Sequence, residues 1–209
     1  WTQVDRPYDV AVLPATGLYV PKNRAHLAEQ AMAAGAEWIW YVDDDHIFPP
    51  DKLEKLLARN VDVVSGVYVK RALPFGPVVY STEDADGEVQ QDAFASSETG
   101  LKSVLAVGAG CLLVKTRVHK ALGTPYWQFG TTRSGQLDGE DVEFCKRVRE
   151  NGMTVWCDFN APVGHRMTII AYPQHTAGQW YIQMVDSKGA VIGARPTAPR
   201  IIQPTPRLV

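Results

Sequence analysis

Three consecutive aspartates, Asp43, Asp44 and Asp45, stand out in the sequence because adjacent like charges repel one another. They directly follow residues 37–42 (EWIWYV), an apolar and aromatic run that is typical of a buried strand. Side chains alternate along a strand, so Asp43 and Asp45 can point to the same side, where two hard oxygen ligands suit Mg²⁺ or Mn²⁺. The alternatives are that Asp44 or Asp45 caps the helix expected from Pro49 onward, or that the cluster is only solvated.

A second acidic group, Asp138, Glu140 and Asp141, lies at the predicted N-terminus of a helix. Carboxylates in that position satisfy free N–H groups and oppose the helix dipole, which is one interpretation. The other is a general base, because a carboxylate kept ionised there can take a proton from an acceptor hydroxyl. His165 follows a further predicted strand, and it is either a metal ligand or a hydrogen-bonded loop residue.

Alternating strands and helices are predicted to position these groups. Strands are expected over residues 8–15, 37–42 and 61–69, and helices over 21–36 and 49–60. This β-α-β-α-β order implies a parallel sheet with helices on its faces. Ligands of such sheets lie at the carboxyl ends of the strands, so we expect residues 14–16 and 43–45 to face one crevice.

The second half of the chain is predicted to complete an α/β fold with a mixed, mostly parallel central sheet flanked by helices. Its expected strands are 76–81, 102–108, 108–115 and 153–158, and its expected helices are 116–123 and 137–152. Residues 180–194 indicate a hairpin that turns at 186–189. The last residues, 195–209, are rich in proline and arginine and indicate an extended tail.

Composition limits the classes of protein that fit. The 209 residues carry a net charge of −2, which gives no general nucleic-acid-binding signal. No apolar run approaches the roughly 18–20 residues of a membrane span. The cysteines are Cys111, Cys145 and Cys157, an odd set without the spacing of a zinc site. We expect reduced thiols and a cytoplasmic location.

Six motifs in order resemble the GT-A glycosyltransferases, in particular the nucleotide-sugar enzymes of family 2. They are VAVLPAT, NRAHLAEQAMAAGAEWIWYVDDDH, VDVVSGVYVKR, VGAGCLLVKTRV, GEDVEFCKRVRENG and GHRM, over about residues 8–168. The resemblance implies a single GT-A catalytic domain over 1–185, with a nucleotide-sugar half at about 8–81 and an acceptor half at about 82–170, followed by a remainder at 186–209. A Q-x-x-R-W pattern is absent from the sequence, which favours transfer of one sugar over processive synthesis.

The resemblance also implies a role for each matching residue. Asp43, Asp45 and His165 would hold Mn²⁺ or Mg²⁺ against the donor diphosphate, and Asp44 would lie near the donor ribose or sugar. Asp141 would be the base of an inverting transfer, with Glu140 as its substitute. The other expected donor-side contacts, at the nucleoside pocket, the base or phosphates and the sugar, are Pro14, Ala15, Thr16, Arg24, Gly108, Ala109 and Gly110.

The expected reaction is metal-dependent transfer from a nucleoside-diphosphate sugar, with a UDP-sugar as first choice, to an acceptor hydroxyl. The acceptor is left open among a protein, a glycan, a small molecule and modified DNA. Two alternatives remain at this point. One is a sugar nucleotidyltransferase, although PATGLYVPKNR is a poor match to its glycine-rich loop. The other is a module that binds a metal or a sugar without turnover.

Overall fold

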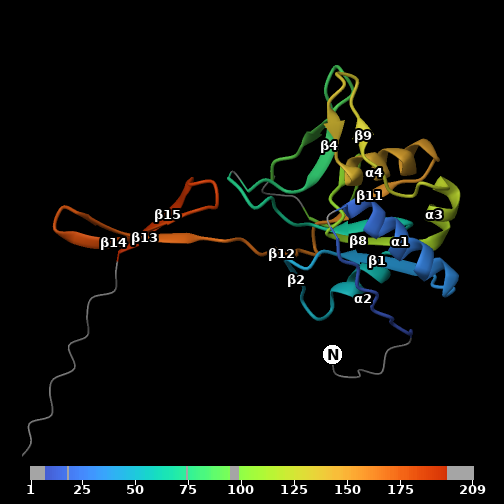
Figure 1. The fold of residues 1–209 in the computed structure, drawn as a ribbon, viewed down its shortest axis with the longest axis horizontal. Coiled ribbons are helices and arrows are strands. Elements are labelled where there is room, and N and C mark those ends of the chain that lie inside the picture. Colours follow the sequence, from blue (N-terminus) through green and yellow to red (C-terminus); the bar gives the residue numbers. More distant parts are fainter. Residues whose placement is uncertain (1–7, 18, 74, 95–98, 197–209) are drawn as a thin grey trace, which may run out of the picture. The chain divides into compact units, whose positions relative to one another are not determined.

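The protein is described by a computed structural model that covers residues 8–17, 19–73, 75–94 and 99–196 (Figure 1). Contacts divide the chain into two compact units. The first unit comprises residues 1–69 and 76–165, and the second comprises 70–75 and 166–209. All the candidate site residues belong to the first unit. None of the helices within the described ranges is long and apolar enough to cross a membrane.

The first unit is built on a five-stranded sheet in the order β1-β8-β3-β11-β6. The strands are β1 (Trp38–Val42), β8 (Cys111–Lys115), β3 (Val63–Gly66), β11 (Val155–Asp158) and β6 (Leu101–Val104). Only the β3–β11 pair is parallel, and the other three pairs are antiparallel. The prediction of a mixed sheet is confirmed, but the expectation that its strands pair mostly in parallel is wrong. The reason is β8, which enters after a glycine turn and lies between β1 and β3.

Helices cover both faces of this sheet. They are α1 (Val20–Ala33), α2 (Lys52–Leu57), α3 (Thr116–Leu122) and α4 (Glu140–Glu150). Alternation along β8 separates two cores, because Leu112 and Val114 pack with α1, α3 and α4, whereas Cys111 and Leu113 pack with Leu56 of α2. The helices predicted in these four regions are confirmed, with shorter bounds than expected.

The first predicted strand, residues 8–15, is wrong. Within the described segment 9–16 the chain adopts neither helix nor strand. Val10, Val12 and Leu13 expose 50%, 74% and 40% of their surface. Tyr8 is held by a 2.9 Å hydrogen bond from its hydroxyl to Oε1 of Glu54 in α2. An apolar run predicts a strand only where a partner strand pairs with it, and periodicity does not reveal that partner.

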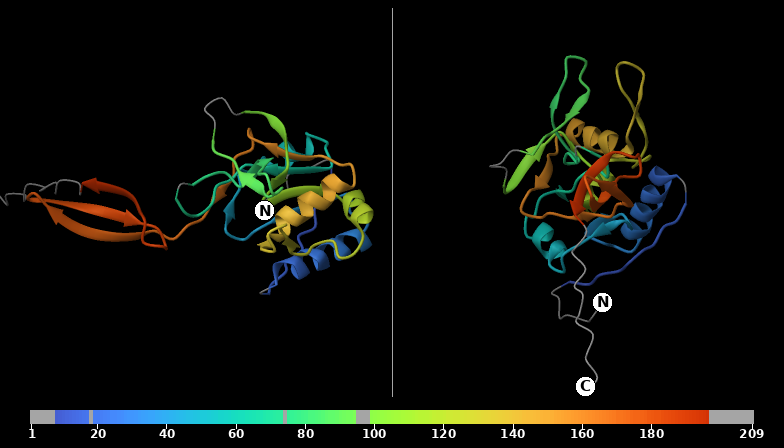
Figure 2. Two further views of the ribbon diagram at one scale, coloured as in Figure 1. Left: turned by 90° about the horizontal axis from the view of Figure 1, so that it is seen from above. Right: turned by 90° about the vertical axis from the view of Figure 1, so that its left-hand side faces the viewer.

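The first unit also contains three smaller sheets of two or three short strands. β4 (Val79–Glu83) pairs with β5 (Val89–Gln91) and β7 (Ala106–Val107), and β9 (Gly130–Thr131) pairs with β10 (Leu137–Asp138). Figure 2 shows the two hairpins projecting in the same direction, and the Ser134 hydroxyl joins them by donating to Glu88 Oε1 at 2.6 Å. A further two-residue ladder joins β2 (His46–Ile47) to β12 (Gly164–His165).

The second unit contains an antiparallel sheet of β13 (Ile170–Thr176), β14 (Gln179–Val185) and β15 (Val191–Pro196). The predicted hairpin is confirmed, because β14 and β15 pair across the turn at 186–189. Asp186 organises that turn, since its Oδ1 accepts the N–H groups of Lys188 and Ala190, each at 2.9 Å. The predicted tail lies outside the described residues from 197 onward.

Candidate functional site

Two histidines face each other at the rim of the central sheet. β1 ends at Val42, and the chain then turns so that the His46 N–H donates to the Asp43 carbonyl at 3.3 Å. The turn leads directly into β2, whose register with β12 places His46 opposite His165. Their rings stack with centroids 4.4 Å apart and planes 17° apart. His46 is therefore buried beside His165.

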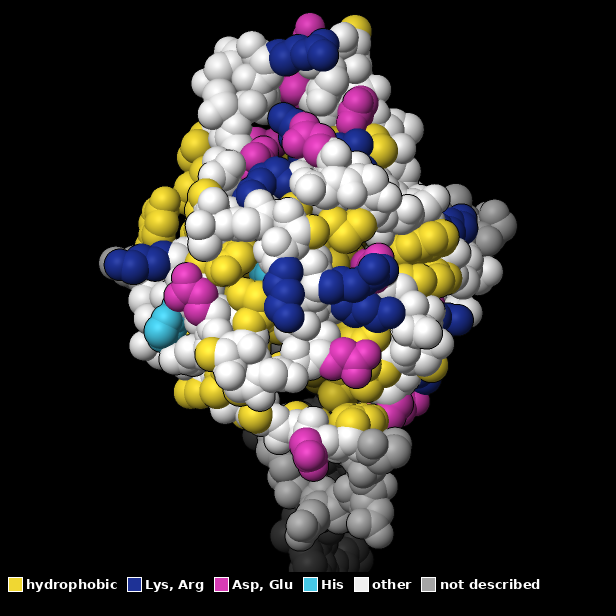
Figure 3. All heavy atoms as spheres, turned by 90° about the vertical axis from the view of Figure 1, so that its right-hand side faces the viewer, with side chains coloured by type: hydrophobic (Ala, Val, Ile, Leu, Met, Phe, Trp, Pro, Cys, Tyr) yellow, Lys and Arg dark blue, Asp and Glu magenta, His cyan; other side chains and the backbone are white. Residues whose placement is uncertain are grey.

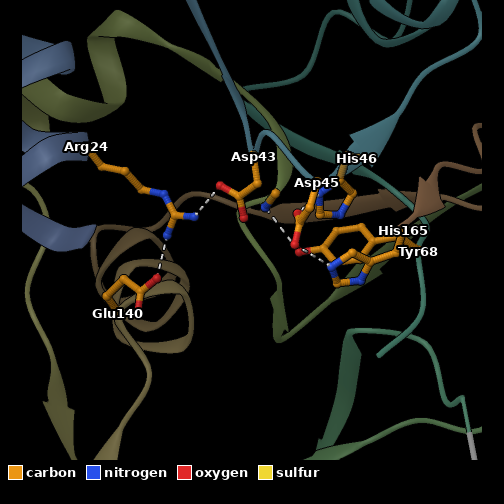
Figure 4. A network of polar contacts seen from close by, with 8 residues as sticks. Arg24, Asp43, Asp45, His46, Tyr68, Glu140 and His165 are labelled. Atoms are coloured by element: carbon orange, nitrogen blue, oxygen red, sulfur yellow. Dashed lines mark hydrogen bonds and ion pairs between the residues drawn. The ribbon is translucent and has the colours of Figure 1, made fainter. Parts of the chain in front are cut away.

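Asp45 joins this pair of histidines (Figure 4). Its Oδ1 lies 3.1 Å from His46 Nδ1, and its Oδ2 lies 3.4 Å from His165 Nε2. One ligand atom from each of the three residues lies within 4.8 Å of the others. His165 Nδ1 lies 2.8 Å from the Val69 carbonyl. A proton on Nδ1 makes this a hydrogen bond and leaves the Nε2 lone pair available to a metal.

These three residues fit a divalent cation. His46 Nε2 is buried and has no hydrogen-bond partner among the described residues, although a buried polar atom normally has one. Burial first, and the charge of His165 second, lower the pKa of His46, which favours the neutral ligand form. Two imidazoles and one carboxylate suit a transition metal such as Mn²⁺ better than Mg²⁺, which prefers oxygen ligands.

Arg24 of α1 connects the two acidic motifs. Its Nη2 donates to Asp43 Oδ1 at 3.0 Å, and its Nη1 donates to Glu140 Oε1 at 2.5 Å. The guanidinium carbon also lies 5.3 Å from the centre of the Trp127 ring, a cation–π contact. Burial alone would lower the pKa of Arg24, but the charges of Asp43 and Glu140 raise it above its usual value. The structure thus brings Arg24, Asp43 and Glu140 together, an association that the sequence analysis did not predict.

Asp43 differs from the predicted arrangement of the metal site. Among the described residues, the group with metal-ligand geometry holds Asp45 and His165 together with His46, and Asp43 instead pairs with Arg24. Ligation by Asp43 therefore stays a prediction. Asp44 is exposed, and so are Pro14, Ala15 and Thr16, which lie in the irregular segment before α1.

Asp141 lies in the first turn of α4, next to the arginine-linked Glu140. Asp141 is half-buried, and desolvation of its carboxyl group, followed by the charge of Glu140, raises its pKa to about 6. Its Oδ1 accepts the N–H of the adjacent Val142 at 2.9 Å. The residue at the N-cap is Gly139, and no side chain in the described structure caps the helix. Asp141 nevertheless satisfies one N–H of the first turn and both carboxylates lie at the positive end of the helix dipole, so both interpretations of this motif agree with the structure.

The glycine turn before β8 makes room for the site. A Cβ on Gly108 would lie 1.9 Å from the Tyr68 hydroxyl, and one on Gly110 would lie 2.5 Å from His46 Cε1. The same Tyr68 hydroxyl accepts the Gly110 N–H at 3.1 Å. Ala109 is buried between them, with 2% of its surface exposed. Close packing of Tyr68 and His46 is thus a sufficient reason for both glycines, and approach of a sugar to this turn stays a prediction.

Sequence reasoning missed His46, Tyr68 and Trp127. Trp127 is 3% exposed and stacks on Phe144 with ring centroids 4.1 Å apart, so it supports the site from the core. The adjacency of His46 to three aspartates was the one usable signal in the sequence. No local pattern marks Tyr68 or Trp127, because their roles depend on contacts with residues far away in the chain.

A cavity of about 310 Å³ opens beside α4, between the β4–β5 and β9–β10 hairpins. Asp138 and Val142, which flank Asp141 in sequence, are part of its lining. Basic and acidic side chains both line it, among them Glu88, Arg133 and Lys146. The cavity therefore runs along α4 from Val142 to Glu150 and can hold a polar molecule there.

No family model matches the chain, and no curated protein matches it. Among solved structures, A197 from STIV is similar with a TM-score of 0.50 and 14% identity, over 94% of this chain and 85% of that one. GalNAc-T7, crystallised with UDP, GalNAc and Mn²⁺, gives a TM-score of 0.49 and 12% identity. That match covers 70% of this chain, which spans 30% of the length of GalNAc-T7. The likeness to A197 concerns the fold alone.

Proposed function

We propose that this protein is a metal-dependent glycosyltransferase that moves one sugar from a nucleoside-diphosphate sugar to an acceptor hydroxyl. A UDP-sugar is the donor that we would test first. The observation that carries the proposal is the single polar network around Arg24, which ties Asp43 of the aspartate run to Glu140 of the second acidic motif. Two motifs that are 97 positions apart in sequence thereby become one site beside a candidate cation site.

In this proposal the cation is held by Asp45, His46 and His165. The unpartnered Nε2 of His46 and the ring orientation of His165 support this assignment. A bound Mn²⁺ would supply a Lewis acid for the negative charge that develops on the leaving diphosphate. Tyr68 supports the cluster, since its ring packs edge-on against the His46 ring with the two ring centroids 4.5 Å apart.

In this proposal Arg24 holds the two acidic motifs next to each other. A buried guanidinium with two carboxylate partners keeps its charge, and both partners keep fixed positions. Trp127 limits the movement of the guanidinium by lying against it. This arrangement keeps Asp43, on the donor side of the proposed site, at a fixed distance from Glu140, on the acceptor side.

Asp141 is the proposed base. A pKa of about 6 leaves its carboxylate mostly ionised at neutral pH and still basic enough to accept a proton from the acceptor hydroxyl. The acceptor oxygen would then form the new bond at the anomeric carbon while the bond to the diphosphate breaks, with inversion of configuration. We assign the acceptor to the cavity between the two hairpins, because Asp138 and Val142, the residues on either side of Gly139-Glu140-Asp141, are part of its lining.

The test is a panel of nucleotide sugars with Mn²⁺, measuring binding and release of the nucleoside diphosphate by slow donor hydrolysis. We expect metal-dependent binding of at least one donor. Asp141→Asn should abolish transfer and keep donor binding, whereas His46→Gln should weaken Mn²⁺ binding itself. Asp44→Asn is the matched control for Mn²⁺ binding alone, because Asp44 is an exposed carboxylate of the same run and lies outside the group with metal-ligand geometry. If no nucleotide sugar binds with any divalent cation, the proposal is wrong.

A further inference from the structure

The two units of the chain differ sharply in charge. The second unit holds seven of the 21 Lys and Arg residues and one of the 23 Asp and Glu residues, a net charge of +6. The first unit holds the rest and has a net charge of −8, so the total of −2 conceals the contrast. On the face of the first unit in Figure 3, basic and acidic side chains are interspersed. A unit that is almost purely basic is suited to an anionic partner.

The one acidic residue of the second unit does not offset its basic surface. Asp186 is 1% exposed, and its carboxylate is occupied by two backbone N–H groups of its own turn. Lys188, in the same turn, is exposed, as are Lys70 and Arg166 elsewhere in the unit. The surface of the second unit is therefore positive wherever the described side chains carry a charge.

Apolar side chains lie at the end of the three-stranded sheet where the turn carries Lys188. Ile170 pairs with Val185, and Val185 pairs with Val191, so the three lie in a row on one face across the strands. Ile170 exposes 41% of its surface and Val191 exposes 52%. Tyr172, two positions further along β13 and therefore on the same face, exposes 47%. The row ends at the turn that carries Lys188.

We propose that the second unit docks on an anionic lipid surface through this apolar row and through the basic side chains of the same unit. Aliphatic and aromatic side chains together with cations favour binding at a membrane interface. The apolar side chains enter the boundary between headgroups and acyl chains, and the cations pair with lipid phosphates. A nucleic acid would use the cations but would leave Ile170 and Val191 in water. The inference rests on the second unit alone and does not depend on the proposed sugar transfer.

Vesicle flotation of the full chain tests the inference. The probes are phosphatidylcholine vesicles and vesicles that contain about 30 mol % phosphatidylglycerol. We expect binding to the anionic vesicles only, and a decrease in binding as salt is raised. The double variant Lys70→Gln/Lys188→Gln removes two charges and should lower the partition coefficient about 30-fold. The matched control is Lys120→Gln/Lys146→Gln, which removes two exposed lysines of the first unit and should leave binding unchanged.

A second variant separates the apolar row from the charges. Ile170→Ser/Val191→Ser keeps every charge, and it should also reduce vesicle binding if the row enters the interface. Thermal unfolding of each variant shows that the fold is kept. Failure to bind anionic vesicles, or equal loss in the control variant, refutes the inference. Tight binding of an oligonucleotide, or self-association of the chain, without vesicle binding would also refute it and would identify the other kind of partner.

Discussion

Gly110→Ala perturbs the candidate metal site without replacing any of the proposed ligand residues. The added Cβ would lie 2.5 Å from His46 Cε1, 2.9 Å from His46 Nε2 and 3.0 Å from Asp43 Oδ2. Ordinary contacts of a Cβ begin at 3.4 Å, so the imidazole must move by about 1 Å. The ring has little freedom to do so, because the His165 ring stacks at 4.4 Å on it and the Tyr68 ring packs at 4.5 Å.

The expected magnitude follows from the tolerance of metal sites. Ligand distances hold to within about 0.2 Å, so a displacement of about 1 Å removes His46 from the coordination shell. Disturbing the support of a single ligand commonly costs about 10–100-fold in metal affinity, and we expect a loss at or above the upper end of that range. Overpacking of the buried turn should also cost about 1–3 kcal/mol of folding stability.

Titration with Mn²⁺, followed by the electron paramagnetic resonance signal of the free ion, measures the affinity directly. The matched control is Gly193→Ala in the second unit, where the new Cβ meets only the flexible end of Met184 at 3.1 Å. Circular dichroism confirms that each variant is folded at the temperature of the titration. If folded Gly110→Ala binds Mn²⁺ as tightly as the original protein, His46 is not a ligand and the proposed cation site is wrong.

Three further predictions concern titration and charge. The rate of sugar transfer should rise with pH through about 6, because Asp141 must be ionised to act as a base. Glu140→Gln should lower that midpoint and Arg24→Met should raise it, since the charge of Glu140 raises the pKa of Asp141 and the charge of Arg24 lowers it; pH–rate profiles showing no shift would contradict this coupling. Burial lowers the pKa of His119 to about 4. The folded state therefore binds fewer protons than the unfolded state below pH 6.5, and stability should fall by about 3 kcal/mol as the pH drops from 6.5 to 4. Urea unfolding at both pH values measures this, and His119→Gln should remove that part of the dependence.

The sequence predicted most elements but not their order in the sheet. The apolar runs that became β1, β3 and β11 and the amphipathic pattern of α4 are local signals, and each formed the predicted element. A β-α-β-α-β order normally places the first strands side by side, and here β8 separates β1 from β3. The glycine turn at 108–110 allows that antiparallel insertion, and no periodicity in the sequence reports it.

The histidine pair could not have been found by pattern either. It depends on the two-residue ladder between β2 and β12, and neither segment shows the alternation of a longer strand. His165 was a candidate because it follows a predicted strand and matches the family motif, and Asp45 because of the run of carboxylates. His46 had only its adjacency to the aspartates as a signal, since its burial and the lack of a partner for its Nε2 among the described residues are properties of the fold.

Arg24 shows why the position of the site could be only partly predicted. Leu27, Ala31 and Ala34 have the i, i+4, i+7 spacing of an apolar helix face, whereas the buried face of α1 runs through Pro21, Arg24, Ala28 and Ala31. That face carries a charge into the core, which costs several kcal/mol unless the charge is paired. The helix can pack in this orientation without that cost only if Asp43 and Glu140 both pair with Arg24. The packing of α1 therefore also joins the two acidic motifs. A helix whose buried face breaks the apolar rule is expected where function, and not packing alone, selects the residue.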